Sequence, residues 1–240
     1  SPGQYAIFQG RTEQRLAQIP FSLLHDLLSD RFNLGDGDRA DMIEDKLARG
    51  LAGVLGAEAP EGFAENARAI ARLAGLGAGQ IAPADAGAPE QLVERERAVG
   101  VLLEYFRAVG RQSAAAVFFL EDIHWADEDS LAVLEQIAGL AADAPLLLVC
   151  LARPLLLERA PDWGASGRVP AERLSLDPLS DADSLELVFQ ILRKLPQVPR
   201  RCKNSLSARL RVTRSTLKNW YEFLSKTASS SLARRRGSSG

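Results

Sequence analysis

The stretch Val117-Phe118-Phe119-Leu120-Glu121-Asp122-Ile123-His124-Trp125-Ala126-Asp127 decides the fold of this chain. An apolar run from Ala114 to Leu120 has the length of a strand and shows no polar alternation. Such runs form strands that are covered on both faces, as in parallel sheets between helices. Glu121 and Asp122 follow the run at once. We therefore expect both carboxylates at the carboxyl end of a buried strand, where open α/β sheets bind ligands.

Further strands and helices are predicted on either side of this stretch. Residues 5–8 form a short apolar run that ends at Gly10, residues 145–151 form a second continuous run, and residues 172–176 alternate as a further short strand. Apolar residues at helical spacing predict helices within residues 20–32, 42–56, 59–76, 89–109, 131–140 and 184–195. The expected fold class is α/β, with a doubly wound parallel sheet and helices on both faces.

An acid pair directly after a buried strand is typical of the Walker B element of P-loop ATPases. In that element the first acid holds Mg²⁺, usually through water, and the second orients or deprotonates the attacking water. Glu121 would then be the metal residue, and Asp122 would act with it in catalysis. The alternative is that the two acids merely begin the next loop. We expect Asp127 to cap the following helix, and His124 and Trp125 to be structural loop residues.

Composition indicates a globular chain without a membrane span. The 240 residues are 46% hydrophobic and 25% charged. No secretory signal opens the sequence, and the longest apolar run, Ala144 to Ala152, is far shorter than the roughly 20 residues that a span needs. We therefore expect a cytoplasmic protein. Cys150 and Cys202 give neither a disulfide framework nor the paired spacing of a zinc site.

The charge is distributed unevenly. Residues 201–240 hold ten Lys or Arg and one acid, Glu222, whereas the first 200 residues hold 19 basic and 30 acidic residues. An acidic body with a basic, Ser-rich end is either a domain with a nucleic-acid-binding tail or a composite of two unlike sequences. One alternative function is therefore a non-enzymatic interaction module that binds nucleic acid through its tail. Another is a divergent metal-dependent hydrolase, although the only histidines are His25 and His124.

Several motifs resemble a known family. They are LEDIHWADEDSLAVLEQIA (Leu120 to Ala138), LLLVCLARPLLLERAPDW (Leu146 to Trp163), RLSLDPLSDADSLELV (Arg173 to Val188) and, more weakly, QIPFSLLHDLLSDRF (Gln18 to Phe32). The chain resembles the predicted ATPase domains of bacterial signalling proteins that stand beside class III adenylate or guanylate cyclase domains or LuxR-type DNA-binding domains. These domains belong to the signal-transduction (STAND) branch of the AAA+ ATPases.

The resemblance implies a site, two cofactors and a partner. It implies a three-layer P-loop NTPase-like sheet that binds ATP with Mg²⁺, and an output domain in cis, either a cyclase or a DNA-binding domain. Glu121 and Asp122 would be the Walker B acids. Arg153 falls where the family senses the γ-phosphate, and an arginine fork suits phosphate oxygens. The alternative for Arg153 is a surface residue that caps the loop before Pro154.

The phosphate-binding loop of this family is not found in the sequence. Such a loop needs glycines followed by Lys and Ser or Thr. The five lysines, Lys46, Lys194, Lys203, Lys218 and Lys226, do not fit that pattern. Because the family places the loop upstream of the part that matches Gly10 to Phe32, we expect that the first strand and this loop are missing. We also expect that the chain does not hydrolyse ATP alone.

The carboxyl end departs from the family after Pro199. Family members continue with a helix and a motif close to GNPFYVEELV, which permissible codons for Arg211 to Tyr221 encode when they are read one base early. We therefore predict a partial ATPase domain over residues 1–199 and a frameshifted, disordered tail over residues 200–240. The alternative is a genuine basic helix in the tail, and only then would nucleic acid be a partner.

Overall fold

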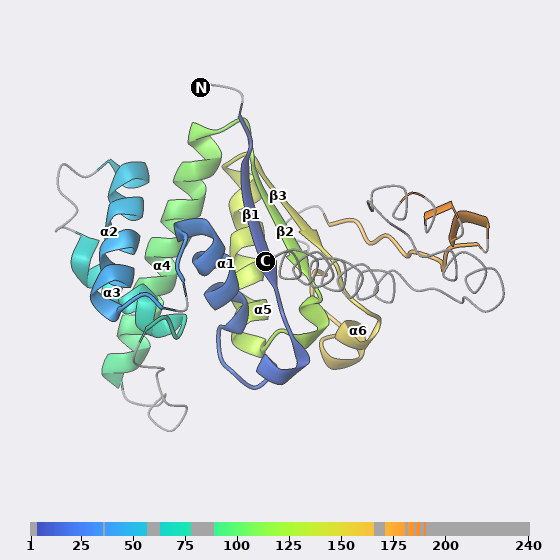
Figure 1. Cartoon of the computed structure of the whole chain (residues 1–240), viewed down its shortest axis with the longest axis horizontal. Helices are drawn as coiled ribbons and strands as arrows, with labels where there is room; N and C mark the ends of the chain where they lie inside the picture. The colour runs from blue at the N-terminus through green and yellow to red at the C-terminus, as the bar shows by residue number, and fades with distance from the viewer. Residues whose placement is uncertain are drawn as a thin grey trace, which may run out of the picture. The chain divides into compact units, whose positions relative to one another are not determined.

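Three parallel strands form one sheet in the order β1-β2-β3 (Figure 1). The structure is a computed structural model. It describes residues 4–35, 37–56, 63–77, 89–165, 171–180, 182–184, 186, 187 and 190. The chain divides into two compact units, Ser1–Ala171 and Glu172–Gly240, and the sheet belongs to the first.

The strands are β1 (Ala6–Arg11), β2 (Ala116–Glu121) and β3 (Leu146–Cys150), as three of the four apolar segments predicted. Arg11 lies beside Glu121, and Leu120 lies beside Cys150. Because all three strands run in the same direction, their carboxyl ends meet at one edge of the sheet. We call this the carboxyl edge.

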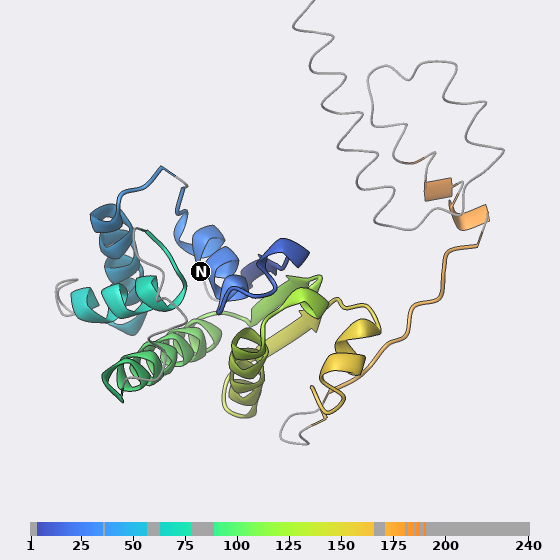
Figure 2. The ribbon, with the colours of Figure 1, turned by 90° about the horizontal axis from the view of Figure 1, so that it is seen from below.

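The helices follow the predicted order along the chain (Figures 1 and 2). They are α1 (Ser22–Phe32), α2 (Ala40–Leu55), α3 (Ala64–Leu73), α4 (Pro89–Gln112), α5 (Glu128–Gly139) and α6 (Leu155–Arg159), with short 3-10 turns η1 (Gln14–Leu16), η4 (Ile123–Trp125) and η5 (Leu140–Ala142). None of the helices in the described part of the chain combines the length and the apolarity that a membrane span requires.

An aromatic cluster joins the sheet to α4. Phe8 of β1 stacks on Phe118 of β2 with 4.5 Å between the ring centroids, and Phe106 of α4 meets both rings edge-on. All three side chains are fully buried. Gly10 leaves room for α1, because a Cβ at this position would lie 3.0 Å from a methyl carbon of Leu23. Alternate residues of β1 and β2 therefore supply the core of the first unit.

The two faces of the sheet differ in cover. Helices α1 and α4 pack on the face that carries Phe8 and Phe118, and α5 packs against these two helices and β3. On the other face, Ile7 is 57% exposed and Leu147 is 54% exposed. The prediction of helices on both faces is therefore not met within the described part of the chain. The sequence could not show this, because an uninterrupted apolar run does not distinguish two covered faces from one.

Other predictions require correction. Residues 171–180 are described and form no strand, and Leu174 and Leu176 are exposed. The alternation at residues 172–176 was misleading because a strand needs a hydrogen-bonded neighbour, and none pairs with it among the described residues. Apolar residues at helical spacing are also not all buried, since Met42 in α2 and Leu92 in α4 are exposed.

Several predictions fall largely or wholly outside the described residues. They are most of the helix at residues 184–195, the boundary at residue 199 and the basic tail.

Replacement of a core ring tests the packing. Phe8→Ala removes a fully buried ring from the aromatic cluster, so we expect it to lower the free energy of unfolding by about 3–5 kcal/mol. Ile7→Ala, at the next position on the exposed face, is the matched control and should cost about 1 kcal/mol or less. Urea denaturation followed by circular dichroism measures both. Equal losses for the two variants would contradict the assignment of Phe8 to the covered face of the sheet and of Ile7 to the exposed face.

Candidate functional site

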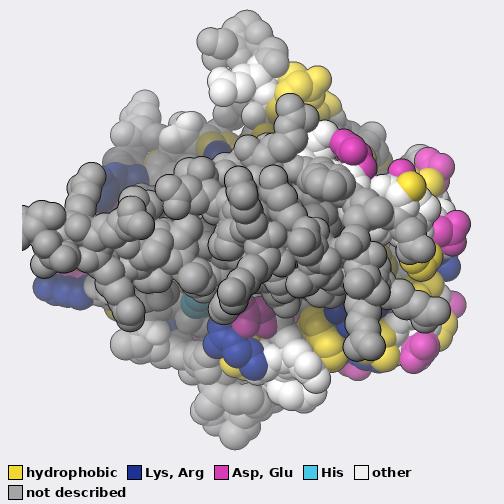
Figure 3. All heavy atoms as spheres, turned by 45° about the vertical axis from the view of Figure 1, so that its right-hand side comes forward, with side chains coloured by type: hydrophobic (Ala, Val, Ile, Leu, Met, Phe, Trp, Pro, Cys, Tyr) yellow, Lys and Arg dark blue, Asp and Glu magenta, His cyan; other side chains and the backbone are white. Residues whose placement is uncertain are grey.

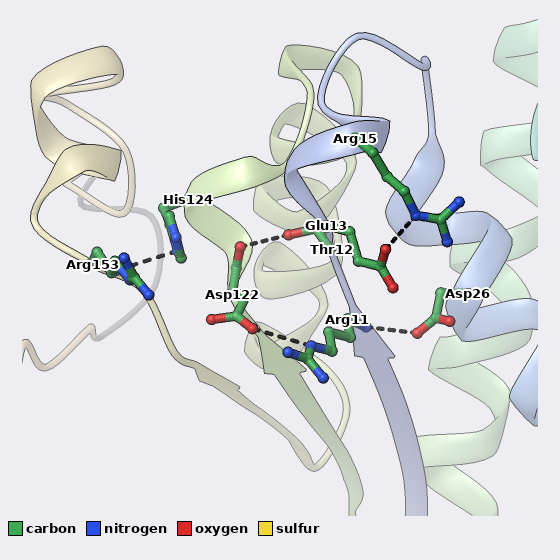
Figure 4. Close-up of polar contacts among 8 residues, drawn as sticks. All are labelled: Arg11, Thr12, Glu13, Arg15, Asp26, Asp122, His124 and Arg153. Atoms are coloured by element: carbon green, nitrogen blue, oxygen red, sulfur yellow. Dashed lines mark hydrogen bonds and ion pairs between the residues drawn. The ribbon is translucent and has the colours of Figure 1, made fainter. Parts of the chain in front are cut away.

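The carboxyl edge brings together charged residues from three distant parts of the chain (Figure 4). Arg11 ends β1, Asp122 follows the last residue of β2, and Arg153 lies three residues after the end of β3. Figure 4 shows the side chains of Arg11 and Asp122 turned toward each other. The predicted acid pair thus lies at the end of a strand, and not on the surface of a helix.

The chain turns sharply directly after Glu121. Asp122 has a φ of 57°, in the left-handed region, which Asp tolerates better than most residues. The 3-10 turn η4 follows, and the chain becomes extended again at Ala126. We call residues 122–127 the acid loop. This turn lets two consecutive acids lie at the edge while the chain moves on into α5.

Asp122 is held from β1 by a side chain and through its backbone. The Nε atom of Arg11 donates to Oδ2 of Asp122 at 3.1 Å, and the Thr12 hydroxyl donates to the Asp122 carbonyl oxygen at 2.5 Å. The ion pair is accessible, with 48% of the Arg11 side chain and 38% of the Asp122 side chain exposed. An exposed ion pair contributes about 1 kcal/mol or less. The Asp122 carboxylate can therefore exchange this partner for another at small cost.

Sequence reasoning missed Arg11 and Thr12. Both lie at the end of β1, so the rule that selected Glu121 would also have selected them once β1 was placed beside β2. Their backbone is fixed as well, because the Arg11 N–H donates to Oδ2 of Asp26 in α1 at 2.7 Å. Nearby, a hydrogen bond from Arg15 lowers the pKa of the exposed Glu13 carboxyl.

His124 is a buried residue of the acid loop. Its side chain is fully buried beside the ring of Trp125, with 4.9 Å between the ring centroids. The backbone N–H of Arg153 points at Nδ1 of His124 at 3.5 Å, which requires an unprotonated Nδ1. Burial lowers the pKa of His124 below its ordinary value of 6.5. His124 therefore acts as a neutral link between the acid loop and the segment after β3.

The side chain of Arg153 is exposed near the carboxyl edge. It forms no salt bridge with any other residue that the structure describes. In Figure 3, by contrast, a described basic group and a described acidic group lie side by side below the centre of the view, although other charged groups stand apart. An exposed arginine without such a partner is suited to an anionic ligand, which agrees with the role predicted for Arg153 but does not test it.

Asp127 caps α5 as predicted, and it also holds α1. Its carboxylate accepts hydrogen bonds from the Ser130 N–H at 2.8 Å and the Ser130 hydroxyl at 2.6 Å. The same two oxygens accept bonds from the N–H groups of Phe21 at 3.1 Å and Ser22 at 3.3 Å, at the start of α1. One buried carboxylate therefore joins the starts of two helices and fixes the end of the acid loop.

Removal of this carboxylate should be costly. Asp127→Ala removes a helix cap and leaves several buried donors without an acceptor, so we expect a loss of about 3 kcal/mol in the free energy of unfolding. Glu128→Ala, the control, changes an exposed residue in the first turn of α5 and should have a much smaller effect. Urea denaturation compares the two variants. Similar losses would contradict the double cap.

The buried His124 predicts a pH dependence. Because its pKa in the folded protein lies below the value of 6.5, the stability that comes from burying the neutral ring is present above pH 6.5 and is lost as the pH falls through the folded pKa. We expect His124→Gln to reduce the difference in unfolding free energy between about pH 8 and about pH 5.5. Urea titrations of both proteins at the two pH values measure this, and an unchanged difference would exclude His124 as the cause.

The donor set of the edge fits a hard cation that is shared with a ligand. Mg²⁺ is usually held by one or two carboxylates together with phosphate oxygens and waters. Glu121 and Asp122 supply two carboxylates, and no group of three or more His, Cys, Asp or Glu residues that could hold a metal ion occurs among the residues described. The site therefore suits a cation that takes its other ligands from a bound anion and water.

Comparison with known proteins identifies the family of the chain. A family model described as the AAA ATPase domain matches residues 3–149, which is more than half of the chain. No curated protein and no solved structure matched the chain. The parallel α/β sheet with its flanking helices is consistent with the P-loop NTPase-like fold that this family implies.

Proposed function

Since this chain belongs to the AAA ATPase domain family, we propose that it is part of a nucleotide-binding regulatory module of a bacterial signal-transduction protein. Members of the family depend on ATP and Mg²⁺ in general. The proposal adds the place where the cation and the phosphates lie, the residues that contact them, and the kind of protein that the module controls.

The placement of the acid pair carries the proposal. Glu121 ends β2, the central strand of the three, and Asp122 follows it directly. Arg11 ends β1 on one side, and Arg153 lies three residues after β3 on the other. Ligands of open α/β sheets bind outside the carboxyl ends of the strands. Two acids between two arginines match a ligand that carries both phosphate groups and a cation.

Each residue receives a role in this site. When the nucleotide site is complete, Glu121 would hold Mg²⁺, and Asp122 would orient or deprotonate the water that attacks the γ-phosphate. Mg²⁺ supplies neutralisation of the phosphate charge when it is bound. Arg153 contacts the γ-phosphate through its guanidinium fork. Arg11 keeps the Asp122 carboxylate directed along the carboxyl edge until a ligand enters.

A cation titration tests the acid pair. We expect Mn²⁺, a spectroscopic substitute for Mg²⁺, to bind weakly at Glu121 and Asp122, and we expect the double change Glu121→Gln/Asp122→Asn to weaken that binding by about tenfold or more. Glu128→Gln/Asp129→Asn changes the next acid pair of the same sequence and is the matched control. Electron paramagnetic resonance measures free Mn²⁺. Equal loss in both double variants would contradict the assignment.

The 240 residues contain no lysine in the pattern of a phosphate-binding loop. Its backbone amides and lysine supply much of the contact with the β- and γ-phosphates in P-loop ATPases. We therefore propose that this chain alone binds MgATP more weakly than about 1 μM and does not hydrolyse it. Isothermal titration calorimetry with MgATP is the measurement, and micromolar or tighter binding would refute this part of the proposal.

The regulatory part rests on the motifs that resemble signalling ATPases. ATP and Mg²⁺ would hold the module in one conformation and hydrolysis would release it, so that the module controls an output domain in cis, either a cyclase or a DNA-binding domain. Such a module works in the cytoplasm. We further propose that the ATPase part extends to residue 199 and that the sequence after it is out of frame. The genomic DNA across this region tests both points.

A further inference from the structure

The segment that follows β3 wraps around the acid loop. We call residues 151–164 the strap. The Ile123 N–H donates to the Leu151 carbonyl oxygen at 3.1 Å, and the indole N–H of Trp163 donates to the Leu131 carbonyl oxygen in α5 at 3.4 Å. Leu156, in the middle of the strap, is buried in the core. The strap is therefore fastened at both ends and at its centre.

Arg159 makes the most specific contact between the strap and the loop. Its Nη1 donates to the His124 carbonyl oxygen at 2.7 Å, and its Nη2 donates to the Ala126 carbonyl oxygen at 2.8 Å. His124 and Ala126 are both fully buried. A buried carbonyl oxygen without a donor is costly, and a charged donor gives a stronger hydrogen bond than a neutral one. One guanidinium fork thus satisfies two loop carbonyls that lie two residues apart, on either side of Trp125.

The Arg159 fork holds the middle of the acid loop by its carbonyl oxygens, where Leu151 and Arg153 also contact it. Thr12 and Arg11 fix the loop at Asp122, and Asp127 fixes its other end. Asp122 occupies the left-handed region, and a residue other than glycine stays there only when its surroundings determine its conformation. Arg159 restrains the residues that follow Asp122, and in this way it helps to keep Asp122 in the left-handed conformation.

We propose that Arg159 is a positioning residue for the Glu121–Asp122 pair, and that the strap couples Arg153 to the direction of these acids. Arg153 lies near the start of the strap and its N–H contacts His124, while Arg159 ends α6. An anion bound by Arg153 therefore acts on the same short segment that fixes the acid loop. The coupling rests on the proposed function, whereas the fork on the two carbonyls is independent of it.

Amide hydrogen exchange of the full chain, measured by NMR, tests the fork. In Arg159→Gln we expect the amides of Ile123, Trp125 and Ala126 to exchange about tenfold faster or more, relative to the amides of β2 in the same sample. Arg159→Lys keeps the charge but not the fork, so it should give a smaller acceleration. Arg49→Gln is the control, because Asp45, on the exposed face of α2, is the partner of Arg49 among the residues that the structure describes. Loop exchange that is unchanged relative to β2 in both Arg159 variants would overturn the proposal.

Mn²⁺ affinity tests the effect on the acids. A positioning role predicts that Arg159→Gln weakens Mn²⁺ binding about threefold or more, with Arg159→Lys between this variant and the wild type. An unchanged affinity together with faster loop exchange would show that the fork is only structural, and would overturn the positioning role. If the wild-type chain binds no Mn²⁺, the proposed function fails instead. The coupling is then tested by the amide exchange rates of the acid loop with and without pyrophosphate, measured for the wild type and for Arg153→Gln. Equal rates in all of these samples would refute the coupling.

Discussion

The Asp127 carboxylate is the constraint on which the site depends. Asp127 lies 9% exposed between α1 and α5 and accepts hydrogen bonds from the first backbone N–H groups of both helices. Helix α1 in turn fixes the end of β1, because Asp26 accepts a hydrogen bond from the Arg11 N–H. The same carboxylate therefore sets where the acid loop ends and where the neighbouring strand presents Arg11. A cap of α5 thus also aligns two parts of the carboxyl edge that are more than a hundred residues apart in the sequence.

The parallel sheet turns this alignment into a site. Strands that run in one direction end at one edge, so each contributes the residues that follow it. Exposed pairs such as Arg11 with Asp122 are weak enough to be exchanged for a ligand. The buried Asp127 carboxylate and the part-buried hydrogen bonds from Arg159 to buried loop carbonyls hold the backbone. A rigid backbone with exchangeable charged side chains is what a nucleotide switch requires, since the ligand must compete for the side chains without unfolding the loop.

The strands and the acid pair could be predicted from local pattern, because a continuous apolar run followed by two acids specifies a strand end. Asp127 could be predicted as a cap because an Asp directly before a helix accepts hydrogen bonds from backbone N–H groups of its first turn. The partners could not: Arg11, Thr12 and Arg159 act through contacts with residues 33 to 111 positions away, and a single sequence contains no signal for such pairs. The strand predicted at residues 172–176 was wrong because alternation describes only one strand, whereas a sheet also needs its neighbour.

The central claim is that the carboxyl edge of this sheet is where the cation of a nucleotide binds. Paramagnetic broadening of backbone amide signals by Mn²⁺ tests it most directly, because broadening reports proximity even when binding is weak. The account predicts that broadening begins at the residues that end the three strands, around Thr12, Asp122 and Arg153, before any other described part of the chain. Broadening that begins instead at the acidic first turn of α5, or evenly over the exposed acids of α2 and α4, would contradict it.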